Sequence, residues 1–208
     1  MLQTQAVEAQ LLELLKDLMK EDLFQSFYLV GGTSLSLQLG HRNSIDIDLF
    51  GSDYLDNIEI LEILNRLGKV TTLKQSKVIK IYEVNGIKVD IVSYQYPWLE
   101  PAKVIEGIRL ASKKDIAAMK LNAITGRGSK KDFIDLYFLL KEYTLKEIMA
   151  FYNEKFKDGS SFLVLKSLCY FEDADKQKMP KMYIDISWKE IKNIILEKYN
   201  SFFKNLNE

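Results

Sequence analysis

The stretch FYLVGGTSLSLQLGHRNSIDIDLF, residues 27–50, decides the fold. It opens with a short apolar run that has strand propensity and ends at Gly31-Gly32, and residues 33–39 then carry leucines one helical turn apart. Residues 44–50 alternate Ile or Leu with Ser or Asp, which is the period of a strand with one apolar face and one acidic face. The stretch therefore predicts a strand, a glycine turn, a helix and a second strand.

The flanking segments extend this pattern into an α/β region. Leucines at helical spacing predict a helix over residues 3–20, and a second apolar series predicts one over residues 56–67. Residues 70–73 are typical of a strand. Residues 78–84 and 87–94 flank Asn85-Gly86, the dipeptide favoured in type I′ turns, and so predict a β-hairpin. The sheet is therefore expected to be mixed and partly antiparallel.

The second half of the chain has the periodicity of helices almost to its end. Ser112 is placed to cap a helix that runs through Ala123, and Gly126 and Gly128 interrupt the pattern before the next helix. Further helices are expected over residues 129–140, 144–156, 160–169 and 187–204, with a loop at residues 172–178. The fold class predicted is α+β, with a catalytic α/β domain at residues 1–102 and a helical domain at residues 103–208.

Composition excludes several kinds of site. One cysteine and one histidine in 208 residues exclude a disulfide framework, a four-cysteine zinc site and a zinc site of several imidazoles. No stretch has eighteen consecutive apolar residues, and the N-terminus lacks the pattern of a signal peptide, so a cytoplasmic protein without a membrane partner is expected. The chemistry is left to carboxylates, lysines, arginines and hydroxyls.

Asp46 and Asp48 are the first candidates for chemistry. Residues at i and i+2 of a strand project from one face, where two carboxylates repel unless a cation lies between them. Magnesium prefers one or two protein carboxylates together with phosphate oxygens and water, so this pair beside a glycine turn at a helix N-terminus suits a nucleoside triphosphate. The alternative is a solvated strand face, and the position after Gly-Gly-Thr-Ser favours the metal.

Asp90 is a third carboxylate, within the apolar segment Lys88–Val92. An acid in such a strand must face solvent, a partner or a metal. In two-metal phosphoryl transfer it could bind the catalytic ion and accept the proton of the attacking hydroxyl.

Lys120 and Arg127 lie two helical turns apart and could present both cations on one face, either to a triphosphate or to solvent. Asp132 and Asp135 follow at i and i+3 on the next helix, where one could orient Lys120 or Arg127. Asp135, which precedes Leu136, is expected to be the more buried of the two.

Four blocks of the sequence together resemble a known family. Val30-Gly31-Gly32-Thr33-Ser34-Leu35, Arg42-Asn43-Ser44-Ile45-Asp46-Ile47-Asp48-Leu49-Phe50 and Val89-Asp90 resemble motifs of the DNA polymerase β nucleotidyltransferase superfamily. Lys120-Leu121-Asn122-Ala123-Ile124 with Arg127, and Lys131-Asp132-Phe133-Ile134-Asp135-Leu136-Tyr137, resemble the AbiEii/AbiGii toxin family. The resemblance covers roughly residues 25–141.

The resemblance implies a nucleotidyltransferase fold, in which a mixed sheet carries an acidic triad and a helical domain closes over the nucleotide. It implies metal ligation of Mg²⁺ or Mn²⁺ by Asp46, Asp48 and Asp90, and catalytic roles for these three with Lys120 and Asp135. It implies that the nucleotide is bound by Gly31, Gly32, Thr33, Ser34, Arg42, Lys120 and Arg127.

The expected function is transfer of a nucleoside monophosphate from an NTP to an acceptor hydroxyl. Residues 103–141 hold nine basic and four acidic side chains, a net charge of +5, which favours an RNA acceptor such as the 3′ end of tRNA. The resemblance implies the toxin of a type IV toxin–antitoxin or phage-abortive-infection system, neutralised by a separately encoded antitoxin. The alternatives are transfer to a protein hydroxyl and a degenerate member that binds nucleotide or a partner without turnover.

Overall fold

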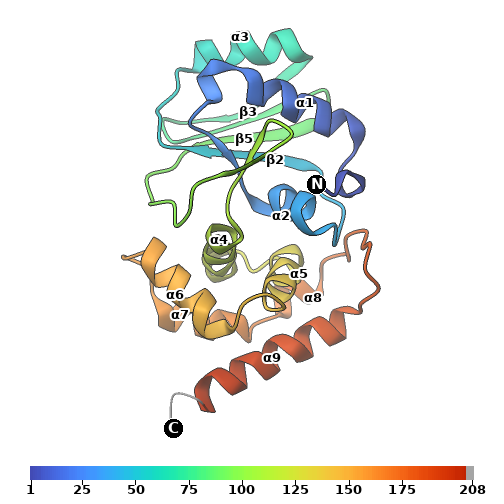
Figure 1. Cartoon of the computed structure of the whole chain (residues 1–208), viewed down its shortest axis with the longest axis vertical. Coiled ribbons are helices and arrows are strands. Elements are labelled where there is room, and N and C mark those ends of the chain that lie inside the picture. Colours follow the sequence, from blue (N-terminus) through green and yellow to red (C-terminus); the bar gives the residue numbers. More distant parts are fainter. Residues whose placement is uncertain (205–208) are drawn as a thin grey trace. The chain divides into compact units, whose positions relative to one another are not determined.

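The computed structural model describes residues 1–204 and divides the chain into two compact units (Figure 1). The first consists of Met1–Tyr96 with Pro101–Ala111, and the second contains Pro97–Glu100 and the chain from Ser112 onward. The boundary expected after residue 102 therefore falls inside the first unit, because residues 103–110 belong to its sheet. Within residues 1–204, no helix combines the length and apolar character needed to cross a membrane.

A seven-stranded mixed sheet forms the first unit, in the order β3-β4-β5-β2-β1-β7-β6. Its strands are β1 (Tyr28–Leu29), β2 (Asp46–Gly51), β3 (Val70–Gln75), β4 (Ile79–Val84), β5 (Ile87–Ser93), β6 (Lys103–Ile105) and β7 (Ile108–Leu110). The helical segments of this unit are η1 (Thr4–Ala6), α1 (Ala9–Lys20), η2 (Asp22–Phe24), α2 (Gly31–Leu39) and α3 (Asn57–Leu67). The central pair β2–β5 and the pair β1–β7 are parallel, and the other pairs are antiparallel. The predicted mixed, partly antiparallel sheet is thus confirmed.

The hairpin β6–β7 lies in the half of the chain for which the sequence pattern predicts only helices. Its turn residues Glu106 and Gly107 have φ values of 51° and 81°, close to the 52° and 81° of Asn85 and Gly86 in the predicted hairpin β4–β5. Glutamate rarely adopts a positive φ, so the turn carries no strong signal. Pairing of β7 with β1 is what adds this hairpin to the sheet.

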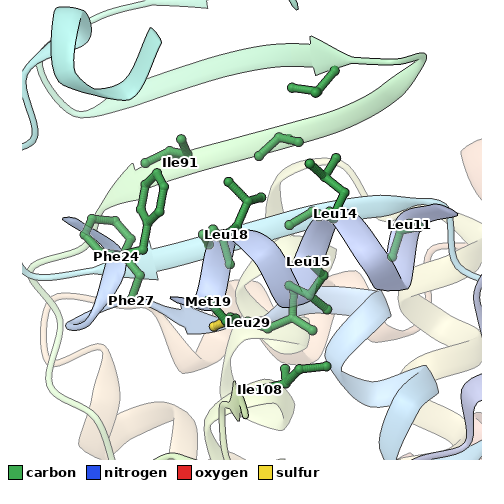
Figure 2. Packing of buried hydrophobic residues seen from close by; sticks show 14 of the residues in the cluster. Leu11, Leu14, Leu15, Leu18, Met19, Phe24, Phe27, Leu29, Ile91 and Ile108 are labelled. Carbon is green, nitrogen blue, oxygen red and sulfur yellow. The ribbon is translucent and has the colours of Figure 1, made fainter. Parts of the chain in front are cut away.

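The apolar face of the sheet is covered by α1 and α3. Leucines of α1 at helical spacing are buried in one cluster with Ile91 of β5 (Figure 2). The same cluster contains Ile47 and Leu49 of β2, Val89 of β5, and Ile60 and Leu64 of α3. Since side chains alternate across a strand, burial of Ile47 and Leu49 turns Asp46 and Asp48 to the opposite face. The hydrophobic core thus determines which face of the sheet carries the carboxylates.

The second unit is helical. Its helices are α4 (Lys113–Gly126), α5 (Lys130–Leu139), α6 (Leu145–Lys155), α7 (Ser161–Leu168), α8 (Glu172–Asp175) and α9 (Trp188–Lys204). Ser112 caps α4 as predicted, accepting a hydrogen bond from the Asp115 amide, and Thr144 forms a capping box with Glu147 at the start of α6. The predicted loop at residues 172–178 instead begins with the short helix α8.

Buried ionic contacts attach Pro97–Glu100 to this helical unit. Lys155 and Asp115, both fully buried, form an ion pair of 2.7 Å. The Asp115 carboxylate also accepts hydrogen bonds from the backbone amides of residues 99 and 100, while Lys155 donates to the Pro97 carbonyl and lies 4.5 Å from the Trp98 ring centroid. The contacts of Lys155 and Asp115 therefore explain why Pro97–Glu100 belongs to the helical unit and not to the unit that contains the sheet.

Candidate active site

Three aspartates project from one face of the sheet. Asp46 and Asp48 alternate with fully buried Ile47 and Leu49 along β2 and are themselves half-buried. The parallel pairing of β2 with β5 places Asp90 directly opposite Asp48. Because paired residues of neighbouring strands point to the same face, the predicted third carboxylate stands beside the predicted pair.

The glycine turn lies against this acidic face. Gly31 has a φ of 66°, and a Cβ atom at this position would collide with the Asp48 carboxylate. Only glycine accommodates both constraints without strain. Gly31 is also the first residue of α2, whose N-cap Val30 provides no side-chain acceptor. The N-terminus of a helix, with backbone N–H groups that favour an anion, is therefore placed next to Asp48.

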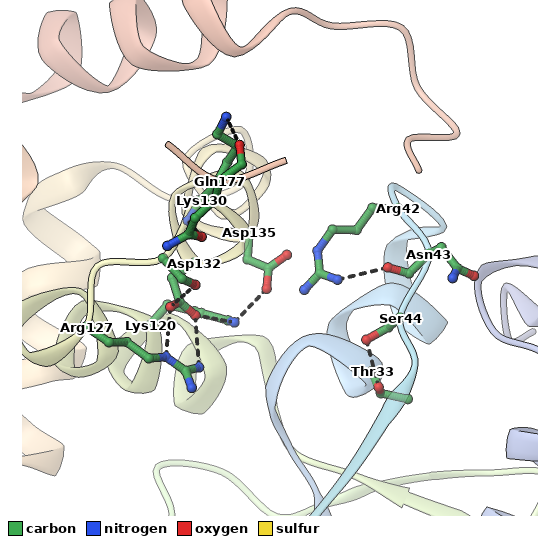
Figure 3. A network of polar contacts seen from close by, with 11 residues as sticks. Thr33, Arg42, Asn43, Ser44, Lys120, Arg127, Lys130, Asp132, Asp135 and Gln177 are labelled. Atoms are coloured by element: carbon green, nitrogen blue, oxygen red, sulfur yellow. Dashed lines mark hydrogen bonds and ion pairs between the residues drawn. The ribbon is translucent and has the colours of Figure 1, made fainter. Parts of the chain in front are cut away.

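The hydroxyls predicted to contact phosphate are used inside the fold. Thr33 is fully buried, and its hydroxyl donates to the Asp46 carbonyl and lies 2.8 Å from the Ser44 hydroxyl (Figure 3). Ser34 is also fully buried and accepts a hydrogen bond of 3.3 Å from Gln38. The contacts of Thr33 join α2 to the start of β2, whereas the Ser34 bond lies within α2. Because both hydroxyls are engaged in these contacts, they would influence a bound phosphate indirectly, by holding the glycine turn in place.

Arg42 lies beside the same turn. Its side chain is 2% exposed, donates to the Asn43 carbonyl at 3.0 Å, and occupies the space that a Cβ atom on Gly32 would need. Gly31 is thus required by its positive φ and by the approach of Asp48, whereas a side chain at position 32 would have to displace the end of the Arg42 side chain. These side-chain contacts cannot be inferred from the sequence, in which Gly31-Gly32 indicates only a turn.

A second polar cluster lies in the helical unit. The Lys120 ammonium is 2.9 Å from Asp132 and 2.6 Å from Asp135, and Arg127 donates to Asp132 at 3.1 Å (Figure 3). Ser129 donates to the same carboxylate at 2.6 Å. Burial raises the pKa of the Asp132 carboxyl, but Lys120 and Arg127 outweigh it and lower the pKa to about 2. The Asp132 carboxyl is therefore ionised at neutral pH.

Comparison with known proteins identifies the family. The family model described as "Nucleotidyl transferase AbiEii toxin, Type IV TA system" matches residues 13–203. The chain belongs to the AbiEii family. It is accordingly a nucleotidyltransferase enzyme with the mixed α+β fold of that class, as its sequence motifs predicted.

Relatives of this AbiEii protein span nearly all of its length. A protein of Aquifex aeolicus strain VF5, named uncharacterized protein aq_aa25, is 38% identical over 201 residues, which cover 93% of this chain and 96% of the relative. MenT4, a nucleotidyltransferase toxin of Mycobacterium tuberculosis H37Rv, has a similar fold, with a TM-score of 0.61 at 12% identity over 91% of this chain and 81% of that chain. JHP933 of Helicobacter pylori has a TM-score of 0.56 at 19% identity over 95% and 94% of the two chains.

Two features of the AbiEii site were not anticipated. The Asp132 carboxylate accepts hydrogen bonds from Lys120, Arg127 and Ser129, and so is as central to the cluster as Asp135. Burial does not separate the two acids, since Asp132 is 1% and Asp135 0% exposed. The second feature is Lys88, whose ammonium lies 2.7 Å from the Asp90 carboxylate. Over residues 1–204, no three Asp, Glu, His or Cys side chains converge closely enough to hold a metal by themselves.

Much of the basic charge of residues 103–141 is engaged within the protein. Arg109 donates to three backbone carbonyls, those of Met19, Phe24 and Phe27. Lys130 is 6% exposed and bonds to the Gln177 carbonyl. Lys113 and Lys114 pair with Glu142 and Glu100. Ion pairing of Lys113 and Lys114, together with the internal contacts of Arg109 and Lys130, therefore reduces the number of side chains in this segment that can contact a polyanion.

Proposed function

We propose that this AbiEii protein moves a nucleoside monophosphate from an NTP to the 3′-terminal hydroxyl of an RNA, in particular tRNA. One observation carries the proposal: Asp46 and Asp48 share a sheet face with the Gly31 turn, which meets the Asp48 carboxylate at the N-terminus of α2. Carboxylates beside a phosphate-binding helix end are what a metal-bound triphosphate requires. The family and its type IV description further support a toxin that is neutralised by a separately encoded antitoxin.

The residues of the acidic face fit a divalent ion. Asp46 and Asp48 provide the hard oxygen ligands that Mg²⁺ or Mn²⁺ prefers, and phosphate oxygens and water would complete its shell. Bound there, the ion would neutralise charge on the reacting phosphate. The N–H groups that open α2 bind the phosphates, and the backbone of Gly31 allows their approach. Thr33 and Arg42 fix the turn through their contacts with Ser44, Asp46 and Asn43.

The reaction itself replaces a phosphoanhydride bond of the NTP with a phosphodiester bond to the acceptor. The acceptor oxygen bonds to the α-phosphorus, the bond from that phosphorus to the bridging oxygen breaks, and pyrophosphate leaves. The hydroxyl proton passes to a carboxylate or to water. The presence of both Asp46 and Asp48 favours an active enzyme over a non-catalytic family member. Two neighbouring carboxylates repel each other, so the pair does not stabilise the fold by mutual contact.

The acceptor is tested by incubating the protein with each labelled NTP, Mg²⁺ and total tRNA. We expect label on tRNA with at least one NTP and none on the protein. Label on protein alone would favour the alternative acceptor, a protein hydroxyl, and no label with any NTP would favour the non-catalytic alternative.

We expect tRNA binding to fall steeply with salt, by a log-log slope of about −0.7 per contacted phosphate if the contacted strand is single. Lys131→Glu with Lys103→Glu should weaken binding further, because both lysines are exposed and lie in the basic segment. Reversal of Lys130 is unsuitable because its side chain is buried. A binding titration at several salt concentrations provides the measurement. If the double variant binds tRNA as tightly as the parent, the basic segment is not part of the RNA-binding surface.

Lys120 is proposed to contribute its charge to the triphosphate, with Asp132 and Asp135 holding the ammonium in place. Lys120→Ala is expected to reduce kcat/KM at least about tenfold, equivalent to roughly 1.4 kcal/mol of transition-state stabilisation. Circular dichroism at the assay temperature checks that the buried cluster still folds, and Lys113→Ala serves as the control because that lysine pairs with Glu142 on the surface. A folded Lys120→Ala protein with parental kcat/KM would make this lysine purely structural.

A further inference from the structure

Lys88 stands among the three aspartates of the acidic face. The parallel register of β2 and β5 sets Lys88 opposite Asp46 and Asp90 opposite Asp48. Residues at i and i+2 of β5 also share a face, so Lys88 lies next to Asp90 along the strand and next to Asp46 across it. One cation is thus built into a group of three carboxylates.

The contact with Asp90 is direct. The Lys88 ammonium lies 2.7 Å from the Asp90 carboxylate, whose side chain is 18% exposed against 42% for the lysine. On the other side, Glu83 of β4 is opposite Lys88 in the antiparallel register, but its side chain is exposed. Of these two acids, Asp90 is the one whose charge is partly shielded from solvent, so its attraction to Lys88 is the less screened.

We propose that Lys88 takes the place of a second metal ion, so that the active centre binds a single divalent ion on Asp46 and Asp48. The Lys88 ammonium compensates the negative charge of the Asp90 carboxylate, so a divalent ion is drawn to Asp46 and Asp48 instead. A second divalent ion at Asp90 would have to displace the ammonium or lie beside it against charge repulsion. Asp90 is then a positioning residue for Lys88 rather than the third metal ligand expected from the sequence. The inference rests on the proposed metal site at Asp46 and Asp48.

The test is a titration of the full chain with Mn²⁺ alone, with free Mn²⁺ followed by electron paramagnetic resonance. The parent protein is expected to bind one ion. Lys88→Met should either bind a second ion or bind its first about tenfold more tightly, because the group then holds an uncompensated carboxylate. Lys88→Arg, which keeps the charge, should behave as the parent, and Lys88→Met with Asp90→Asn should return to one ion with parental affinity.

The outcomes separate this inference from the proposed function. Two ions bound by the parent, or identical titrations for Lys88→Met and Lys88→Arg, would overturn the role of Lys88 and leave the Asp46–Asp48 site standing. No binding by the parent would overturn the metal site and, with it, the inference. Far-ultraviolet circular dichroism of each variant checks its fold, and the number of ions bound by the parent still tests the inference if the methionine variant fails to fold.

Discussion

Replacing Asp48 with asparagine is expected to abolish nucleotidyl transfer while leaving the fold intact. The amide keeps the size of the side chain but removes the negative charge that a divalent ion needs. Asp48 shares its face with Asp46 and Asp90, so losing one charge there relieves repulsion, and we expect stability to be unchanged or slightly higher. Transfer from labelled NTP and the midpoint of thermal unfolding measure the two effects.

The control for this experiment is Asp53→Asn. Asp53 is an exposed acid that accepts a hydrogen bond of 2.6 Å from Ser26 and lies just beyond the end of β2. The same loss of one negative charge at this position should leave transfer intact. Full activity of Asp48→Asn would refute the metal assignment, and equal loss in both variants would point to a general effect of net charge.

The largest expected effect on stability comes from Lys155→Met. The methionine keeps the apolar stem but leaves the fully buried Asp115 carboxylate without its cation. Burial lowers the pKa of Lys155, while the contact with Asp115 acts in the opposite direction, so the pair is held together against a desolvation cost. Removing one partner of a buried ion pair lowers the free energy of unfolding by about 3 kcal/mol or more. Urea denaturation monitored by circular dichroism gives the change in free energy of unfolding.

Lys113→Met is the matched control for this stability measurement. It removes the same charge from the same helical unit, but Lys113 is 27% exposed and pairs with the 36% exposed Glu142. A pair of this kind contributes only about 0.2–1 kcal/mol, because solvent screens it. If both variants lose equally little stability, the Lys155–Asp115 pair does not anchor Pro97–Glu100 in the manner described.

The local pattern of the sequence determined the elements that carry the site. Alternation over residues 44–50 predicted a strand with both aspartates on one face, and the observed strand Asp46–Gly51 has Ile47 and Leu49 buried and the aspartates on the other face. The glycine pair correctly marked the start of a helix, and Asn85-Gly86 correctly marked a hairpin. These features depend on backbone conformation and side-chain period within a few residues, which is why local sequence suffices for them.

Only the tertiary structure decided which distant residues meet. The register that sets Asp90 beside Asp48 arises from parallel pairing of strands some forty residues apart. The partners Glu142 of Lys113 and Glu100 of Lys114 likewise lie outside residues 103–141, so counting charges along that segment could not reveal that these lysines form ion pairs within the fold. The strands at residues 103–110 exist because β7 pairs with β1, although their turn residue Glu106 favours no such turn. Long-range pairing follows from how the whole core packs, and no short stretch of sequence encodes it.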